Sequence, residues 1–174
     1  ARHGEMQWAT RLEQALDEDR FVLYAQRIEP LTGEATGLHA EVLIRMLDAD
    51  GSMILPSAFL PAAERFHMAT RIDRWVLKHA LQQIEALPEL AALDTLCINL
   101  SGHSVGDRAF HRHAIEVLGA AGPAVCQRIC LEITETAAVT NMADAAVFIE
   151  QVRALGVRIA LDDFGAGASS FGYL

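Results

Sequence analysis

The sequence predicts an α/β fold in which parallel strands alternate with covering helices, either a closed (β/α) barrel or a doubly wound sheet. Strand-sized apolar runs alternate with helix-length amphipathic segments through the second half of the chain. The last two strand–helix units repeat after 33 and 30 residues, measured between Asn99, Glu132 and Asp162. The 174 residues, of which 52% are hydrophobic, suffice for one domain with a sizeable core.

The chain begins with an amphipathic segment. Residues 4–19 place Trp8, Leu12 and Leu16 on one helical stripe, which predicts a helix with one packed face. We expect residues 1–19 to form a linker helix and residues 20–174 to form the domain.

Two strands and two helices are expected next. Apolar runs predict the two strands, over residues 21–28 and 38–46. Turn residues predict a loop after the second strand, over residues 48–51. We expect Ser57 to cap a short helix that ends near Phe66. A helical period predicts a long helix over residues 72–87.

The remaining chain alternates regularly between strand and helix. Gly122 and Gly156 follow the two amphipathic segments and mark the helix ends. The expected strands span residues 95–101, 128–134 and 157–162, and the expected helices span residues 107–120 and 142–155.

Composition narrows the functional classes. The chain has 14 basic and 23 acidic residues, a net charge of −9, which argues against binding DNA through its phosphates. No apolar run is long enough to span a membrane. The three cysteines form no Cys-x-x-Cys pair, so we expect reduced core thiols in a cytoplasmic protein. His111 and His113 lie about 200° apart on a helix, so we expect them at the solvated surface.

Polar residues interrupt the apolar strands. Glu41, Asn99, Glu132 and Asp162 each stand within or at the end of such a strand. Parallel strands are usually apolar on both faces, and a buried carboxylate is costly without a cation or hydrogen bonds. Oxygen ligands of these types suit Mg²⁺ or Mn²⁺, and parallel α/β folds place their sites at strand carboxyl ends. The pattern therefore predicts a divalent-metal site.

Asp162 and Asp163 are adjacent, so both side chains reach one site only if the chain turns immediately. Gly165 and Gly167 permit such a turn because glycine tolerates positive φ. Together with Glu132, the two aspartates could hold two ions roughly 4 Å apart, the spacing used for phosphoester displacement.

Four sequence blocks resemble the signature motifs of EAL domains, which are bacterial cyclic di-GMP phosphodiesterases. They occur in the family's order within residues 21–174 and read Glu41-Val-Leu-Ile-Arg45, Asn99-Leu-Ser101, Glu132-Ile-Thr-Glu135 and Asp162-Asp-Phe-Gly-Ala-Gly-Ala-Ser-Ser170. Tyr24-Ala-Gln26 and Ile54-Leu-Pro56-Ser-Ala-Phe59 resemble flanking elements of the family. The resemblance implies a modified TIM-type (β/α) barrel whose first strand runs antiparallel.

The resemblance also implies roles for individual residues. The implied ligands of a two-metal Mg²⁺ or Mn²⁺ site are Glu41, Asn99, Glu132, Asp162 and Asp163. Among these, the implied catalytic residues are Glu41, Asp162 and Asp163. The implied substrate contacts are Gln26, Leu43 and Arg45, with the arginine reaching a phosphate. The implied reaction hydrolyses one phosphodiester bond of cyclic di-GMP and yields linear pGpG.

The resemblance has further implications for the whole protein. The family's lysine, a further glutamate and a glutamine follow the glycine loop, so we expect an incomplete barrel that is inactive by itself. The implied partners are cyclic di-GMP, a second copy in a homodimer, and an upstream sensor or GGDEF-type domain. The alternative is a non-catalytic cyclic di-GMP receptor or a dimerising regulatory module. Val42 replaces the alanine of the signature, and we expect it to point away from Glu41.

Overall fold

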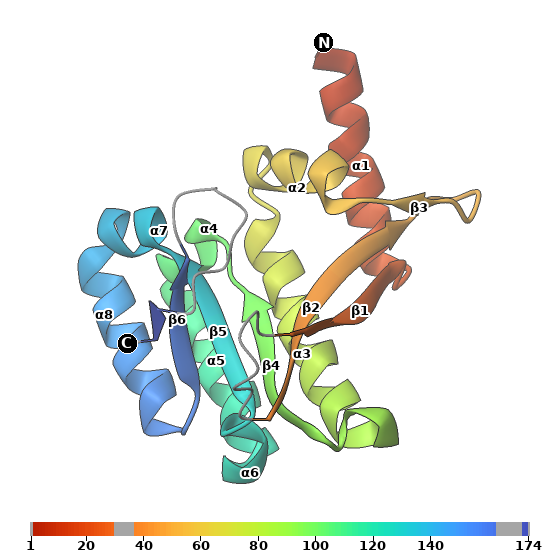
Figure 1. The fold of residues 1–174 in the computed structure, drawn as a ribbon. Coiled ribbons are helices and arrows are strands. Elements are labelled where there is room, and N and C mark those ends of the chain that lie inside the picture. The colour runs from red at the N-terminus through yellow and green to blue at the C-terminus, as the bar shows by residue number, and fades with distance from the viewer. Residues whose placement is uncertain (1, 30–36, 163–171, 174) are drawn as a thin grey trace.

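A curved sheet with helices along one side forms the centre of the molecule (Figure 1). The computed structural model describes residues 2–29, 37–162 and 172–173. The strands are β1 (Phe21–Ile28), β2 (Leu38–Leu47), β3 (Met53–Ile54), β4 (Leu93–Asn99), β5 (Ile129–Thr134), β6 (Arg158–Asp162) and β7 (Gly172–Tyr173). They pair in the order β1-β2-β4-β5-β6-β7, and β3 pairs with β2.

The strand directions agree with the predicted barrel topology. Strands β2, β4, β5 and β6 are mutually parallel, whereas β1 runs antiparallel to β2. The short strands β3 and β7 pair antiparallel to β2 and β6. In the described part of the chain β1 and β7 do not pair with each other, so the sheet is an open arc.

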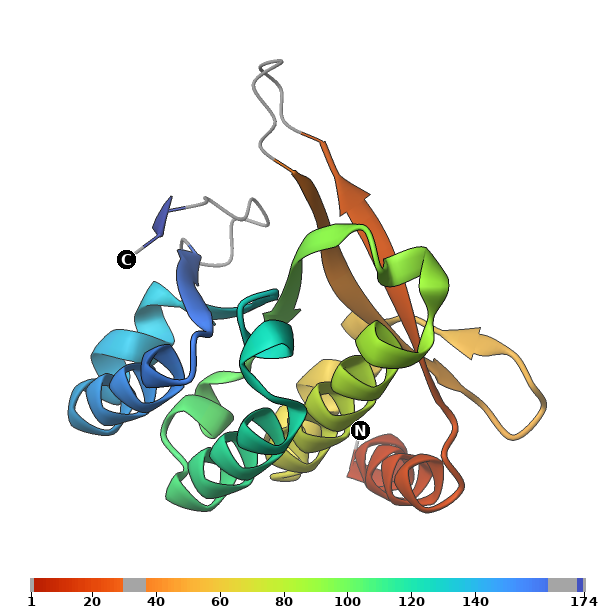
Figure 2. The same ribbon diagram turned by 90° about the horizontal axis from the view of Figure 1, so that it is seen from below.

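The helices lie mainly on one side of this arc. They are α1 (Arg2–Asp17), α2 (Pro56–Arg65), α3 (Ala69–Ala86), α4 (Gly102–Val105), α5 (Arg108–Ala121), α6 (Pro123–Cys126), α7 (Glu135–Thr140) and α8 (Met142–Ala154), with a 3₁₀ turn, η1, at Pro88–Leu90. Figure 2 shows α1, α3, α5 and α8 in a row beneath the sheet. No described helix has the length and hydropathy needed to cross a membrane.

Alternation along the strands separates two apolar clusters. Ile98, Leu131 and Ile159 belong to the main core under the helices, and each is at most 1% exposed. Val42 also lies in this core, as expected from its position beside Glu41. On the opposite face Cys97, Cys130 and Ala160 form a second cluster, against which Ile28 packs. All three cysteines are buried free thiols, as predicted.

Several helix starts differ from the expectation. Helix α2 begins at Pro56, and its N-cap is Leu55 rather than Ser57, because the fixed φ of proline suits the first helical position and proline has no N–H to leave unpaired there. Ser101, expected in a strand, instead caps α4 by accepting a hydrogen bond from the amide of Ser104. The short helices α4, α6 and α7 were not predicted, since four to six residues show no clear helical period.

The prediction that His111 is solvated is wrong. Its side chain is 5% exposed and stacks on Phe148 of α8 with ring centroids 4.3 Å apart. Its Nε2 lies 2.7 Å from the carbonyl oxygen of Val105, which gives the ring a polar partner. His111 is buried because α8 and the end of α4 cover this side of α5, and a single helix's sequence cannot reveal its neighbours.

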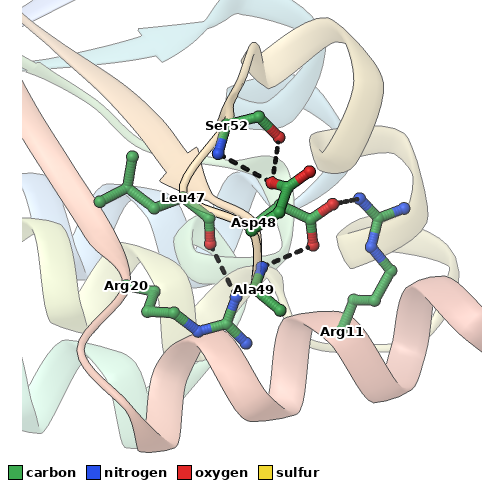
Figure 3. A network of polar contacts seen from close by, with 7 residues as sticks. Arg11, Arg20, Leu47, Asp48, Ala49 and Ser52 are labelled. Atoms are coloured by element: carbon green, nitrogen blue, oxygen red, sulfur yellow. Dashed lines mark hydrogen bonds and ion pairs between the residues drawn. The ribbon is translucent and has the colours of Figure 1, made fainter.

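Helix α1 is attached to the sheet by both packing and polar contacts. Its Leu12 and Ala15 are fully buried in the main core. Arg11 donates to Asp48, in the turn after β2, with a distance of 3.0 Å (Figure 3). Arg20, just after the helix, donates to the carbonyl oxygen of Leu47 at 2.8 Å.

Phe148 provides a test of the core between α5 and α8. It is fully buried and lies 6.1 Å from the Phe110 ring, centroid to centroid. Phe148→Ala is expected to lower the free energy of unfolding by about 3–5 kcal/mol through lost transfer energy and a cavity. Its neighbour Val147 is 55% exposed, so Val147→Ala should change this energy by no more than about 0.5 kcal/mol. Urea denaturation measures both values, and equal effects would contradict this description of the core.

Candidate active site

The strand register brings the predicted polar residues together on the face opposite the main core. Asn99 of β4 is paired with Glu132 of β5, and Thr134 of β5 is paired with Asp162 of β6. Glu41 of β2 is paired with Cys97, two residues before Asn99. Residues two apart on a strand share a face, so these side chains converge from four neighbouring strands.

A direct hydrogen bond links Glu41 to Asn99. The Nδ2 of Asn99 donates to Oε1 of Glu41 at 2.9 Å, although 58 residues separate them in the chain. The carboxamide therefore fixes one oxygen of Glu41. This pair forms one edge of the site.

Glu132 is the most buried member of the site. Its side chain is 3% exposed, and neither carboxylate oxygen has a hydrogen-bond partner among the described residues. Burial, followed by the charges of Glu41 and Asp162, raises the pKa of Glu132 to about 7. A buried carboxylate without partners is costly, so the sequence retains Glu132 at the expense of stability.

Asp162 ends β6 beside Glu132. Its Oδ1 is buried and has no hydrogen-bond partner in the described structure. Asp162 is paired with Thr134, the next residue after Glu132 on the same face of β5, so the two carboxylates are close enough to repel each other. Asp163, predicted as a ligand and a catalytic residue, lies outside the described residues.

A cavity of about 380 Å³ opens beside Asn99. Leu43, a predicted substrate contact, lines it together with residues from β2, α2, α3 and the end of β4. Asp73 of α3 also lines the cavity. The cavity therefore joins one predicted ligand and one predicted substrate contact.

Asp73 is a residue that sequence analysis missed. One oxygen, Oδ2, accepts hydrogen bonds from the amide and hydroxyl of Ser101 at 2.9 and 2.8 Å and from the hydroxyl of Ser104 at 2.6 Å. Burial raises the pKa of Asp73, which these hydrogen bonds oppose. Asp73 thus fixes the chain two residues beyond Asn99. The sequence signal that could have revealed Asp73 is a carboxylate beside the apolar stripe of the helix predicted over residues 72–87.

Gln26 and Arg45, the other predicted substrate contacts, lie on the antiparallel pair β1 and β2. Gln26 is paired with Glu41 across β1 and β2 and is exposed. Arg45 lies four residues beyond Glu41 on β2, a distance of roughly 13 Å along a strand. Its guanidinium carbon lies 5.9 Å from the centroid of the Tyr24 ring, and Nη1 donates to the carbonyl oxygen of Ile44 at 3.0 Å. The arginine is therefore held near the rim of the site.

Comparison with known proteins identifies the family. Residues 9–174 match the family model described as EAL domain. The chain belongs to the EAL domain family.

Individual EAL relatives agree with this assignment. The chain is 36% identical over 168 residues to the cyclic di-GMP phosphodiesterase PdeB of Shewanella oneidensis, covering 96% of this chain and 19% of PdeB. Its fold is similar to the FimX EAL domain of Pseudomonas aeruginosa bound to c-di-GMP, with a TM-score of 0.77, 26% identity and coverage of 92% and 63% of the two chains. It is also similar to Vibrio cholerae LapD S helix-GGDEF-EAL bound to c-di-GMP, with a TM-score of 0.78, 26% identity and coverage of 97% and 40%.

The donor set of this EAL chain fits a divalent cation. The carboxylate oxygens of Glu132 and Oδ1 of Asp162 are buried without partners, and a hard cation prefers such oxygen ligands. Within residues 2–29, 37–162 and 172–173, no three His, Cys, Asp or Glu side chains are arranged to hold a metal by themselves. The amide oxygen of Asn99 is a further donor of the kind that Mg²⁺ or Mn²⁺ accepts. The predicted ligand set therefore stays a prediction.

The raised pKa of Glu132 predicts a pH effect on the metal-free chain. Because the folded state raises this pKa from 4.5 to about 7, the native protein holds a proton that the unfolded chain releases. This proton stabilises the folded state by about 3 kcal/mol at pH values below 4.5. The stabilisation falls as the pH rises above 4.5 and is lost once the pH has passed about 7. Urea denaturation in EDTA across this range measures the decline.

Substitution of Glu132 provides the comparison. Glu132→Gln should flatten the decline, because the amide does not titrate. Glu150→Gln, at an exposed position of α8, should leave it unchanged. The same pH slope in Glu132→Gln and the unmodified chain would show that Glu132 does not titrate as described.

Proposed function

We propose that this chain is the EAL segment of a metal-dependent phosphodiesterase that hydrolyses cyclic di-GMP to linear pGpG. The observation that carries the proposal is the convergence of Glu41, Asn99, Glu132 and Asp162 from neighbouring strands, with unpartnered oxygens on two of them. The EAL family assignment and the similarity to PdeB support the same reaction. The proposal concerns an EAL domain of the length of its solved relatives, since the chain covers 63% of the FimX domain.

Each residue has a proposed role. Glu41, Asn99, Glu132 and Asp162, with Asp163, would hold Mg²⁺ or Mn²⁺. When bound, these ions neutralise charge on the phosphodiester oxygens and activate water near neutral pH. Asn99 keeps Glu41 in position through the 2.9 Å hydrogen bond. Leu43 and Gln26 contact the substrate, one from the cavity wall and one from β1.

Charge is the main constraint on binding an anionic dinucleotide here. The chain has a net charge of −9, and Glu41 and Asp162 already repel a charge on Glu132. Divalent cations and Arg45 would reverse the sign of the local field, since a guanidinium pairs with phosphate through charge-assisted hydrogen bonds. Binding of cyclic di-GMP is therefore proposed to require both the divalent cations and Arg45.

A non-catalytic receptor is the second candidate. The similar FimX and LapD structures are complexes with c-di-GMP, so the fold supports binding of this ligand in other proteins. A receptor needs the substrate contacts Leu43 and Arg45, whereas an enzyme also needs the carboxylates. The retained Glu41, Glu132 and Asp162 therefore favour the enzyme.

Several features of the whole protein are part of the proposal. An upstream GGDEF-type domain is proposed by analogy with LapD, in which S helix, GGDEF and EAL occur in one chain. A homodimer and a cytoplasmic location for this domain are also proposed. A dimerising regulatory role without catalysis is the remaining alternative.

Hydrolysis should depend on Glu41 and on the metal. Glu41→Gln is expected to reduce cyclic di-GMP turnover at least roughly 100-fold. The reason is that losing a metal ligand removes part of the transition-state stabilisation that the metal supplies. Chromatography of pGpG measures turnover in the EAL domain at full length, with Mn²⁺ and with EDTA. Glu150→Gln is the matched control because it changes an exposed glutamate on α8. Turnover in EDTA, or unchanged turnover in Glu41→Gln, would contradict the metal-dependent reaction, and binding without turnover in the presence of Mn²⁺ would favour the receptor.

Arg45 should contribute to substrate affinity. Arg45→Ala is expected to raise KM by about 10- to 100-fold, because a hydrogen bond to a charged group contributes about 1.5–3 kcal/mol. Arg108→Ala removes an arginine that is 85% exposed on α5 and should leave KM unchanged. Calorimetric titration with cyclic di-GMP checks the same effect without turnover. Equal affinity for cyclic di-GMP in the two variants would show that Arg45 does not contribute to substrate binding.

A further inference from the structure

Two cysteines face each other directly beneath the candidate site. Cys97 of β4 and Cys130 of β5 are paired in register, and both are fully buried. They belong to the second apolar cluster, on the same face as Asn99 and Glu132. The proposed hydrolysis uses neither thiol.

The spacing of these cysteines suits a covalent bond. Neighbouring strands lie about 4.8 Å apart, which falls within the range of about 4.4–6.8 Å between the Cα atoms of disulfide-linked cysteines. The two side chains also pack in the same small cluster of buried residues, on one face of the sheet. Arg158 of β6 occupies the next position in the same row.

We propose that Cys97 and Cys130 are a modification site that closes to an intramolecular disulfide when a hydroperoxide oxidises the pair. The sulfur of one thiol attacks one peroxide oxygen, which becomes the hydroxyl of a sulfenic acid, and the O–O bond breaks so that the other oxygen leaves as water or an alcohol. The second sulfur then displaces hydroxide from the sulfenic sulfur, forming the S–S bond and a water molecule. Two thiols lose two electrons in total, and the O–O bond of the peroxide gains them.

Closure of this disulfide would disturb the neighbouring ligands. Linked Cβ atoms lie about 3.8 Å apart, whereas in-register Cβ atoms on neighbouring strands are spaced like the strands at about 4.8 Å, so the two Cβ atoms must approach by about 1 Å. Asn99 and Glu132 are two residues farther along the same strands, and functional geometries tolerate displacements of only about 0.5 Å. This coupling to the metal ligands rests on the proposed function, whereas the disulfide itself does not.

The third cysteine provides an internal control. Cys126 is 1% exposed, like the pair, but it lies on α6 in the main core. Its Sγ donates to the carbonyl oxygen of Leu118 at 3.1 Å. Burial is therefore matched between Cys126 and the pair, and only the pair has a facing thiol.

Thiol mapping of the full chain tests the proposal. The chain is treated with hydrogen peroxide, unfolded in the presence of N-ethylmaleimide, and analysed by intact mass and peptide mapping. We expect alkylation at Cys126 alone, a peptide that links Cys97 to Cys130, and full reversal by dithiothreitol. Cys126→Ala should keep the linkage, whereas Cys97→Ala should lose it. Alkylation of all three cysteines, or linkage through Cys126 or between two chains, would overturn the proposal.

Titration with Mn²⁺ tests the coupling separately. The oxidised chain is expected to bind Mn²⁺ about 10- to 100-fold more weakly than the reduced chain, as when groups that orient metal ligands are disturbed. Equal affinities would overturn the coupling while the mass measurement still decides the disulfide. Absence of Mn²⁺ binding to the reduced chain would instead count against the metal site of the proposed function, and the coupling would fall with it.

Discussion

The in-register parallel pairing of β2, β4, β5 and β6 is the constraint on which the rest of the structure depends. Because side chains alternate with a period of two, this register decides both faces of the sheet at once. One face gives the main core its branched side chains, and the other brings Asn99 beside Glu132. A shift of one residue in β5 would exchange Glu132 with Leu131 and destroy the core and the candidate site together.

Much of this arrangement could be predicted from the sequence because it depends on local patterns. The predicted limits of β1 are those observed, and the alternating faces of β4 and β5 are confirmed. Features that depend on distant contacts could not be predicted. His111 is buried because α8 and the end of α4 cover α5, and Asp73 gains its role from the hydroxyls of Ser101 and Ser104. The position of Asp163 relative to Asp162 is not among the described features.

The candidate site lowers the stability of the folded chain. An apolar residue in place of Glu132 would make the fold more stable. The carboxylate of Glu132 is desolvated and is repelled by the charges of Glu41 and Asp162. Such conflicts between local preference and fold are expected where a protein binds or reacts. The apolar face of the same strands offsets the cost, since Ile98 and Leu131 are fully buried.

The attachment of α1 has a mechanical consequence. Exposed ion pairs such as Arg71 with Glu13, at 2.7 Å, contribute only about 0–1 kcal/mol and would by themselves form a soft tether. Leu12 and Ala15, however, are embedded in the core that supports β2. The helix is therefore a rigid handle on the sheet. A torque applied through α1 is borne by β2, the strand that carries Glu41, Leu43 and Arg45.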